Sequence, residues 1–423
     1  MEIELAPDLL SDLPLSITEL ILSLLPIRDA VRMSTLSTKW RYRWASLPQL
    51  IFDDQCVDPL PDKLVLENRL AKFITHAMLL HNGPIYKFRI STSILQSCPD
   101  IDQWLLVLSR NDVRELTLEF GGDGEWFRVP SCLFSYSKLT LLELCRCELD
   151  PPPGFRGFSC LRTLTLNQVL VVPESIESLI SNCPLLESLT LSYYDGLDLN
   201  INAHNLKYIC LEGEFKEICL QHTPLLEVVS ISLYMNIDEI QEHFEQSSGC
   251  KFVKFLGDVP NLEKLIGHVY FTKYLSIGIE QWTPRFTYSH LKIIELYQVS
   301  FEDTKELLVV LRLITNSPCL QELHISGSSN ANVAQEVSNL DFWETECPSD
   351  CKFNRLKIVK MTDMSGVPHE MELIKILLGN SPVLEKLSIA PCIYVSEFKV
   401  DMLVELVRFR RASPRAEILF IQE

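Results

Sequence analysis

Large apolar residues recur along most of the chain in one spacing, L-x-x-L-x-L, with other apolar residues allowed in place of leucine. In an extended strand alternate side chains point to the same face, so this spacing buries the leucines and leaves the x positions in solvent. One such strand cannot cover its own apolar edge, so successive copies must stack on one another. The pattern predicts an α/β fold, a curved solenoid with parallel strands inside and helices outside. Copies begin at Ile85, Val113, Leu139, Leu161, Leu186, Leu206, Leu226, Leu262, Leu291, Leu320, Leu356 and Leu384.

The distance between copies is roughly 20 to 36 residues, which is similar to the period of leucine-rich repeats. Two copies complete the longer consensus of that repeat, with Cys147 and Cys392 in the slot after the strand. The pattern is weakest at Ile85 and Leu262. Several copies follow a proline, which is expected to stop the preceding helix before the next strand. Near-copies of one Asn-x-Pro junction lie at 182–184, 316–318 and 380–382.

A different spacing precedes the repeats, between Leu13 and Phe52. Apolar residues at helical spacing follow Ser16-x-x-Glu19, which is a capping-box signature for the start of a helix. We expect a second short helix from Asp29 and a third from Ser37. Three short helices cannot hide this many large apolar groups, so the surplus predicts a docking partner.

This stretch resembles an F-box, in the form found in plants. In that family the motif binds the small adaptor subunit of SCF-type cullin-RING ubiquitin ligases. The resemblance implies that subunit, and through it a cullin, as partners; the alternative is that the helices only cap a larger fold. The residues that carry the resemblance, and that we expect to bind the adaptor subunit, are Leu13, Pro14, Ile17, Ile21, Leu24, Leu25, Pro26, Val31, Leu36, Ser37, Trp40 and Trp44.

Residues 59–82 predict a helix that links this stretch to the repeats, with Leu64 and Leu70 on its apolar face. Two segments interrupt the repeats, at 241–257 and 327–351. Insertions of this kind either contact a ligand or form surface loops, and both interpretations stay open.

The end of the chain resembles the FBD segment that closes many plant F-box proteins with leucine-rich repeats. It predicts an amphipathic helix carrying Leu403, Leu406 and Val407, and a last strand from Ala416 to Ile421, which together would cap the solenoid. The basic cluster at 408–415 either binds a partner or places cations where they suit a helix C-terminus.

These patterns divide the chain into an F-box at 8–52, a helical linker and N-terminal cap at 53–84, leucine-rich repeats at 85–366, and a last repeat with an FBD-like cap at 367–423. The 423 residues are 47% hydrophobic and 22% charged, which indicates a buried core. The chain lacks a signal peptide and any apolar run long enough to span a bilayer. We therefore expect a soluble protein of the cytosol or nucleus, without a membrane partner.

Charge and cysteine content exclude further classes of site. A net charge of −18 disfavours a nucleic-acid partner, because nonspecific nucleic-acid binding needs basic surface. The 14 cysteines include no CxxC pair and most lie beside apolar runs, so we expect reduced, buried thiols and no metal. We find no Gly-rich phosphate loop, nucleophile elbow or HExxH motif, and expect neither a cofactor nor an enzyme active site.

The resemblance predicts the substrate-recognition subunit of an SCF-type ubiquitin ligase, in which the F-box holds the ligase and the solenoid holds an unknown protein substrate. One alternative is a small-molecule co-receptor like the plant hormone receptors of this architecture, which hold an inositol polyphosphate with basic clusters. About 20 Lys and Arg face about 34 Asp and Glu between Val113 and Gly366, which weakens that alternative. The other is an interaction scaffold without a ligase.

Overall fold

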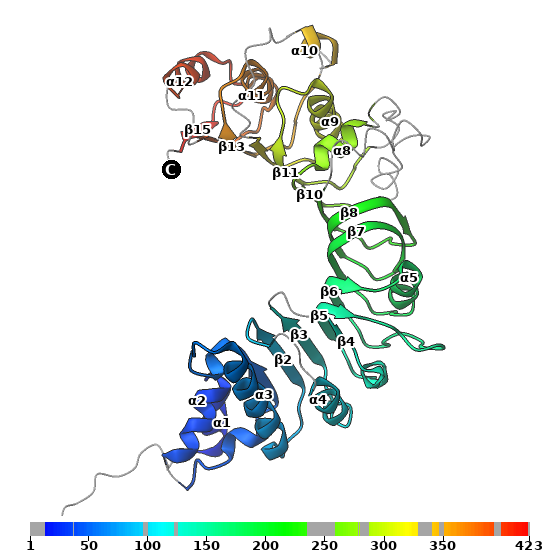
Figure 1. Cartoon of the computed structure of the whole chain (residues 1–423). Helices are drawn as coiled ribbons and strands as arrows, with labels where there is room; N and C mark the ends of the chain where they lie inside the picture. Colours follow the sequence, from blue (N-terminus) through cyan, green and yellow to red (C-terminus); the bar gives the residue numbers. More distant parts are fainter. Residues whose placement is uncertain are drawn as a thin grey trace, which may run out of the picture. The chain divides into compact units, whose positions relative to one another are not determined.

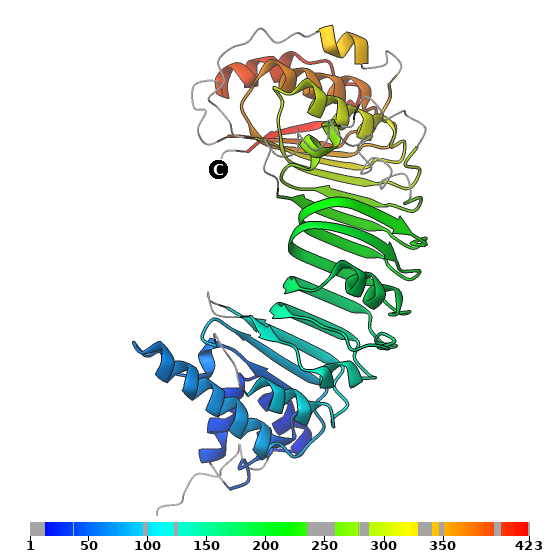
Figure 2. The same cartoon turned by 45° about the vertical axis from the view of Figure 1, so that its right-hand side comes forward.

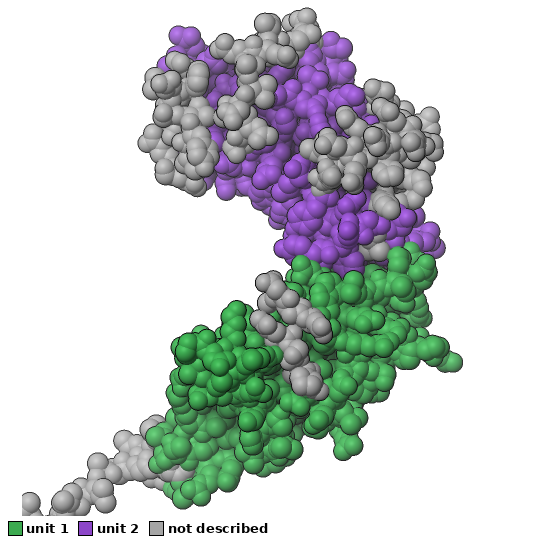
Figure 3. Space-filling model, viewed as in Figure 1, with its two compact units in different colours: residues 1–190 green, residues 191–423 purple. Residues whose placement is uncertain are grey.

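The chain forms two compact units, residues 1–190 and 191–423, each built from neighbouring parallel strands with helices on one side (Figures 1, 2 and 3). The computed structural model describes residues 13–36, 38–95, 100–121, 126–234, 259–277, 279, 287–328, 341–346, 351–392 and 399–421. The predicted insertion at 241–257 and most of the one at 327–351 lie outside these residues.

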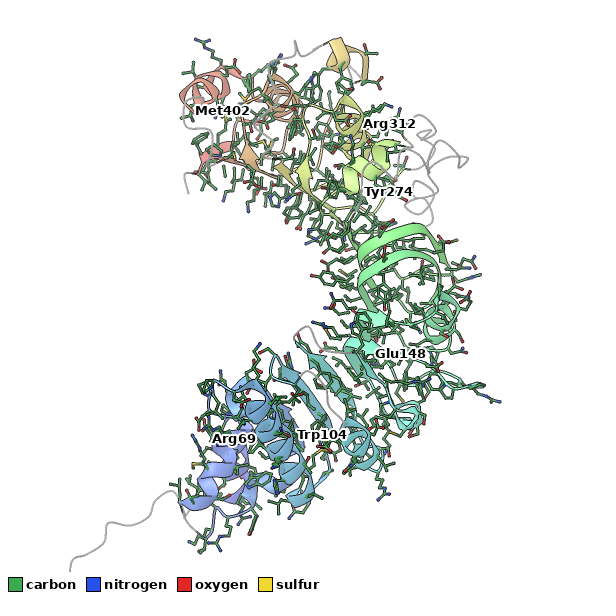
Figure 4. All side chains as sticks on the ribbon, viewed as in Figure 1. Arg69, Trp104, Glu148, Tyr274, Arg312 and Met402 are labelled. Carbon is green, nitrogen blue, oxygen red and sulfur yellow. The ribbon has the colours of Figure 1, made fainter. Side chains whose placement is uncertain are left out.

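The first unit starts with two short α-helices and continues into a parallel sheet of strand order β1-β2-β3-β5-β6, with β4 paired to β5. The Trp104 indole N–H donates to the Thr75 hydroxyl at 3.0 Å and so joins α4 to α3 (Figure 4). The elements are α1 (Leu15–Ser23), α2 (Ile27–Arg32), η1 (Met33–Thr35), η2 (Arg43–Ser46), β1 (Gln49–Phe52), η3 (Asp54–Cys56), α3 (Lys63–Leu80), β2 (Lys87–Thr92), α4 (Ile101–Leu108), β3 (Glu115–Phe120), β4 (Phe127–Arg128), η4 (Ser131–Ser135), β5 (Leu141–Glu148), β6 (Thr163–Leu170) and α5 (Pro173–Ser181).

The second unit carries the strand order β7-β8-β9-β10-β11-β12-β13-β14-β15. Helices α8, α9, α11 and α12 lie on one side of this sheet (Figure 1). The elements are β7 (Ser188–Asn202), β8 (Tyr208–Gln221), β9 (Val228–Leu233), β10 (Lys264–Gly267), α8 (Phe271–Ile277), β11 (Ile293–Val299), α9 (Thr304–Thr315), β12 (Glu322–Gly327), α10 (Asp341–Glu346), β13 (Ile358–Met364), α11 (Pro368–Asn380), β14 (Lys386–Pro391), α12 (Lys399–Arg408) and β15 (Glu417–Phe420).

Every copy of the L-x-x-L-x-L template coincides with a strand, which confirms the predicted repeats and the α/β fold. Side chains at the first, fourth and sixth template positions are at most 2% exposed. The weak copy at Leu262 has Gly267 in its sixth position. A Cβ there would lie 2.1 Å from the ring of Phe271, which is fully buried. The phenylalanine of α8 thus fills the space of the missing leucine.

The sheet begins one strand earlier than the predicted repeats. Leu47-x-x-Leu50-x-Phe52 is a further copy of the template, and its strand β1 pairs in parallel with β2. All three apolar side chains are at most 4% exposed. The F-box-like stretch therefore ends inside the sheet.

The Asn-x-Pro junctions end helices as predicted. Helix α5 ends one residue before Asn182, α9 ends one residue before Asn316, and α11 ends at Asn380. The Asn316 and Asn380 carbonyls accept the backbone N–H of Tyr288 and of Phe353, each at 2.9 Å. Each junction thus contacts the turn that precedes the adjacent strand.

The predicted starts of the first helices are wrong. Helices α1 and α2 begin directly after Pro14 and Pro26, and neither has a side-chain cap. Ser16 is already the second residue of α1 and so is not its N-cap, which is why no Ser16–Glu19 capping box forms. The expected third helix is absent from the described residues, since Tyr42 has a φ of 63° and only the short 3₁₀ helix η2 follows. Ser37 lies outside the described residues.

The apolar faces of helices α3 and α12 differ in part from the prediction. Asp62 caps α3, which buries Leu70 but leaves Leu64 70% exposed in the first turn. The last strand, β15, pairs with β14 as predicted. Helix α12 buries Leu406 together with Met402 (labelled in Figure 4), whereas Leu403 and Val407 are exposed.

Candidate functional site

Helix α1 presents its large apolar side chains to solvent. Ile17 is 43% exposed, Leu20 60% and Leu24 77%, although they share one helical face at spacings of three and four residues. The opposite face buries Leu22 and a polar residue, Thr18, whose hydroxyl donates to the Pro14 carbonyl at 3.2 Å. The helix is therefore inverted relative to an ordinary surface helix, which turns its apolar stripe toward the core.

Apart from Ser37, which lies outside the described residues, the residues expected to bind the adaptor subunit fall into three groups by exposure. Two of them, Trp40 and Trp44, are 3% exposed and belong to the core beneath the helices. Leu15 and Leu20 are exposed apolar residues that the motif did not single out, although their spacing from Leu24 could have identified Leu20. The exposed group is Pro14, Ile17, Leu24, Pro26 and Leu36, and the half-buried group is Leu13, Ile21, Leu25 and Val31.

Hydrogen bonds attach these helices to the rest of the first unit. The Gln49 side-chain amide donates to the Ser23 carbonyl at 2.9 Å and joins β1 to the end of α1. The Arg28 guanidinium donates to the Gln55 carbonyl at 3.2 Å and forms an ion pair with Asp58, which joins α2 to the chain after β1. The exposed apolar face is thus held at a fixed position on the unit.

The x positions of the strands form a second candidate surface. In the first unit its charges are largely matched: Lys87 pairs with Glu115 at 2.7 Å, and Arg89 lies 3.8 Å from Glu119. In the second unit the same positions carry aromatic rings. Tyr297 stacks on His268 at 5.0 Å between ring centroids, and it meets His324 edge-on at 5.0 Å. Burial lowers the pKa of both histidines, so they are neutral at pH 7.

A cavity of about 330 Å³ lies between α11 and the end of α12. Its lining includes Lys375, Ile376, Arg408, Phe409 and Arg410, so part of the predicted basic cluster borders a hollow. Lys375 pairs with Glu372 of the same helix at 2.9 Å. Lys375 is therefore partly neutralised by its own helix.

The described residues hold neither a metal-binding cluster nor a membrane-spanning helix, and two of their buried thiols are poorly reactive. Among them no three His, Cys, Asp or Glu side chains gather in a way that could hold a metal. Burial raises the pKa of the Cys56 thiol to about 12 and that of Cys183 to about 11, so both are protonated and poorly nucleophilic at neutral pH. Across the described ranges, no helix has the length and apolar character to cross a membrane.

Profiles of known families match three parts of the chain. The F-box domain matches residues 10–52, "FBD-associated F-box protein At5g56370, LRR repeats" matches 101–325, and FBD matches 344–389. The FBD match ends ahead of α12, so it covers less of the tail than the resemblance implied.

Relatives in Arabidopsis thaliana match over nearly the full length. The F-box/FBD/LRR-repeat protein At1g13570 is 55% identical over 418 residues, 99% of each chain. The F-box/FBD/LRR-repeat protein At5g56420 is 26% identical and covers 98% of this chain and 99% of its own. A solved leucine-rich-repeat protein of Leptospira interrogans, LIC12759, is 16% identical with a TM-score of 0.29, over 88% of this chain and 96% of that one. The chain belongs to the plant F-box/FBD/LRR-repeat family, and its architecture is that of an F-box substrate adaptor.

Proposed function

We propose that the chain is the substrate-recognition subunit of an SCF-type cullin-RING ubiquitin ligase. The exposed apolar face of α1 and the chain up to Leu36 binds the ligase's small adaptor subunit, and the x positions of the strands bind a protein to be ubiquitinated. Cytosol and nucleus are the proposed locations. The chain itself performs no chemistry in this proposal.

The inverted helix α1 carries the proposal. Leu20 and Leu24 expose 60% and 77% of their surface while Thr18 is buried on the other face. A helix that served only as a cap on the repeats would bury its leucines against them. Contiguous exposed apolar groups mark a protein-binding surface, and this one coincides with the F-box match.

The mechanism is proximity. A substrate held on the sheet while the ligase is held on α1 shares one complex with the activated ubiquitin, so transfer to a substrate lysine becomes effectively intramolecular. The hydrogen bonds from Gln49 and Arg28 support this role, because they hold the docking face at one position on the repeat unit.

Affinity capture with proteasomal degradation blocked tests the proposal. The full chain is compared with a variant carrying Leu20→Asp and Leu24→Asp. Deleting residues 1–50 would be unsuitable, since that deletion removes Leu47 and Leu50 and uncovers β2. We expect the wild type to capture the adaptor subunit and a cullin, and the variant to lose both but retain the substrate. Equal recovery of the ligase by both proteins would contradict the proposal.

A further inference from the structure

One row of x positions in the second unit combines a carboxylate with aromatic rings. It occupies the seventh template position of four neighbouring strands, β8 to β11, and consists of Glu212, Ser232, His268 and Tyr297. Glu212 is the register partner of Ser232. His268 and Tyr297 directly follow Gly267 and Leu296, which are also register partners. Neighbouring strands lie about 4.8 Å apart, so the row spans about 14 Å.

A second pair of rings flanks the start of this row. Tyr193 and Tyr234 stack with centroids 5.8 Å apart and ring planes 21° apart. They are 51% and 38% exposed, and the Tyr234 hydroxyl donates a hydrogen bond to Glu212. Glu212 therefore contacts the Tyr193–Tyr234 pair through Tyr234, and Ser232 is the one row position between it and His268.

Glu212 carries a charge that no ion pair with a described residue neutralises. Within the described part of the chain, no Lys, Arg or His side chain lies within ion-pair distance of it. Glu295, one strand away from His268, is instead paired with Lys264 at 2.9 Å. In the first unit Glu115 and Glu119 likewise have basic neighbours on adjacent strands. The His268 imidazole is neutral at pH 7 and does not compensate Glu212.

The chemistry of the row fits a cationic side chain. Aromatic faces attract cations through their quadrupole, and an adjacent carboxylate adds charge attraction. A guanidinium fits better than an ammonium, because it is planar, stacks on rings and can donate two parallel hydrogen bonds to one carboxylate. We propose that this row, together with the flanking ring of Tyr234, binds an arginine-bearing segment of the protein substrate; the substrate assignment rests on the proposed function.

Panning a phage library of random dodecapeptides against the full chain tests this inference. The comparison uses Glu212→Gln, which removes the charge and keeps the shape, and Glu405→Gln, which removes one negative charge from the exposed surface of α12. We expect arginine to be enriched in peptides selected by the wild type and by Glu405→Gln, and not in those selected by Glu212→Gln. For the best peptide, replacing arginine by the uncharged isostere citrulline is expected to weaken binding about tenfold, as is Tyr297→Ala.

Equal arginine enrichment with Glu212→Gln would overturn the inference, because the attraction would then come from the net charge of the chain. Selection of acidic or neutral peptides, or no selection at all, would overturn it too. Recovery of the ligase's adaptor subunit is measured on the same proteins and is expected to be unchanged by Glu212→Gln. A wild-type chain that selects no arginine but still binds the adaptor subunit contradicts only this inference, whereas a wild-type chain that selects arginine without binding the adaptor subunit contradicts only the proposed function.

Discussion

The serine of the Asn-Ser-Pro junction is buried in both of its copies, but the two hydroxyls differ. The Ser317 hydroxyl donates to the Leu313 carbonyl at 2.6 Å, whereas the fully buried Ser381 hydroxyl has no partner among the described residues. Burying an unpaired hydroxyl costs free energy that an alanine would not cost. The third copy carries Cys183, a less polar residue, at the same position.

We expect Ser317→Ala to lower the free energy of unfolding by about 1 kcal/mol, since a buried hydrogen bond is lost. Ser381→Ala is expected to leave it unchanged or raise it by about 1 kcal/mol. Urea unfolding of the full chain, followed by tryptophan fluorescence, measures both variants. A similar loss in the two would mean that Ser381 has a hydrogen-bond partner after all.

Glu370 predicts a pH dependence of stability. Its carboxylate accepts the backbone N–H of Ser365 at 3.2 Å and of Gly366 at 2.6 Å, but burial dominates and raises its pKa to about 7. Between the ordinary glutamate pKa and 7 the folded state binds more protons than the unfolded state, so this contribution to stability is lost as pH rises through that interval.

The expected size of this pH effect is at most about 3 kcal/mol between pH 5 and 8. Glu370→Gln removes the titration, so the melting temperature of the wild type should fall relative to that of the variant as pH increases from 5 to 8. Thermal melts across that range measure the difference. A difference that stays constant with pH would show that Glu370 titrates normally.

Some backbone positions could not be predicted from residue type. Arg146, Gln168, Tyr193, Gln298 and Asp363 all have φ between 51° and 60°, two residues after the sixth template position. The strand register shifts at this point beside Gln298 and Asp363. Glycine is the usual sign of a left-handed residue, and none of these positions carries one. The irregularity is imposed by stacking of the repeats, which the spacing of leucines does not describe.

At the scale of elements, strands were more predictable than helix boundaries. Two alternating buried leucines per strand determine where a strand lies and which face is buried, so even the weak copy at Leu262 was placed correctly. Helices α1 and α2 start at prolines in place of the expected polar caps. Strand β1 was missed because its template, from Leu47, lies inside the stretch that resembles an F-box.

The candidate docking face was predictable as a set of apolar residues but not as a surface. A single sequence does not show which side of α1 faces the core, and the burial of Thr18 reverses the usual expectation. Trp40 and Trp44, which carry much of the F-box resemblance, proved to be core residues. The motif thus contains both the exposed residues proposed to dock the adaptor subunit and the buried residues that support them.

Substitutions on the two faces of helix α1 are expected to affect adaptor binding and stability separately. We expect Leu20→Ala combined with Leu24→Ala to abolish recovery of the adaptor subunit with a change in stability below about 1 kcal/mol, because both side chains are exposed. Leu22→Ala, on the buried face, is the matched control and should cost about 2–5 kcal/mol. Co-purification and thermal melts measure the two effects. A large loss of stability in the double variant would show that these leucines pack against the repeats in solution.

At the scale of the whole molecule, a repeat array must cover its last strand. Helix α12 buries Met402 and Leu406, and β15 pairs with β14. The Ser413 hydroxyl donates to the Leu384 carbonyl at 2.7 Å, and the Ala412 N–H donates to the Leu378 carbonyl at 2.9 Å. The residues after β14 thus satisfy the backbone of the last repeat as well as cover its apolar side chains.

Truncation after Ala390 is therefore expected to yield an aggregating or rapidly degraded protein, although the F-box is intact. Met402 and Leu406 alone contribute about 3–6 kcal/mol of apolar burial, and typical domains have a net stability of only about 5–15 kcal/mol. In the full chain Leu406→Ala should destabilise by about 2–5 kcal/mol, whereas the exposed Val407 should tolerate the same change. Size-exclusion chromatography and thermal melts distinguish these cases. A soluble truncation that unfolds cooperatively and binds the adaptor subunit, yet loses its substrate, would instead make the tail a recognition element.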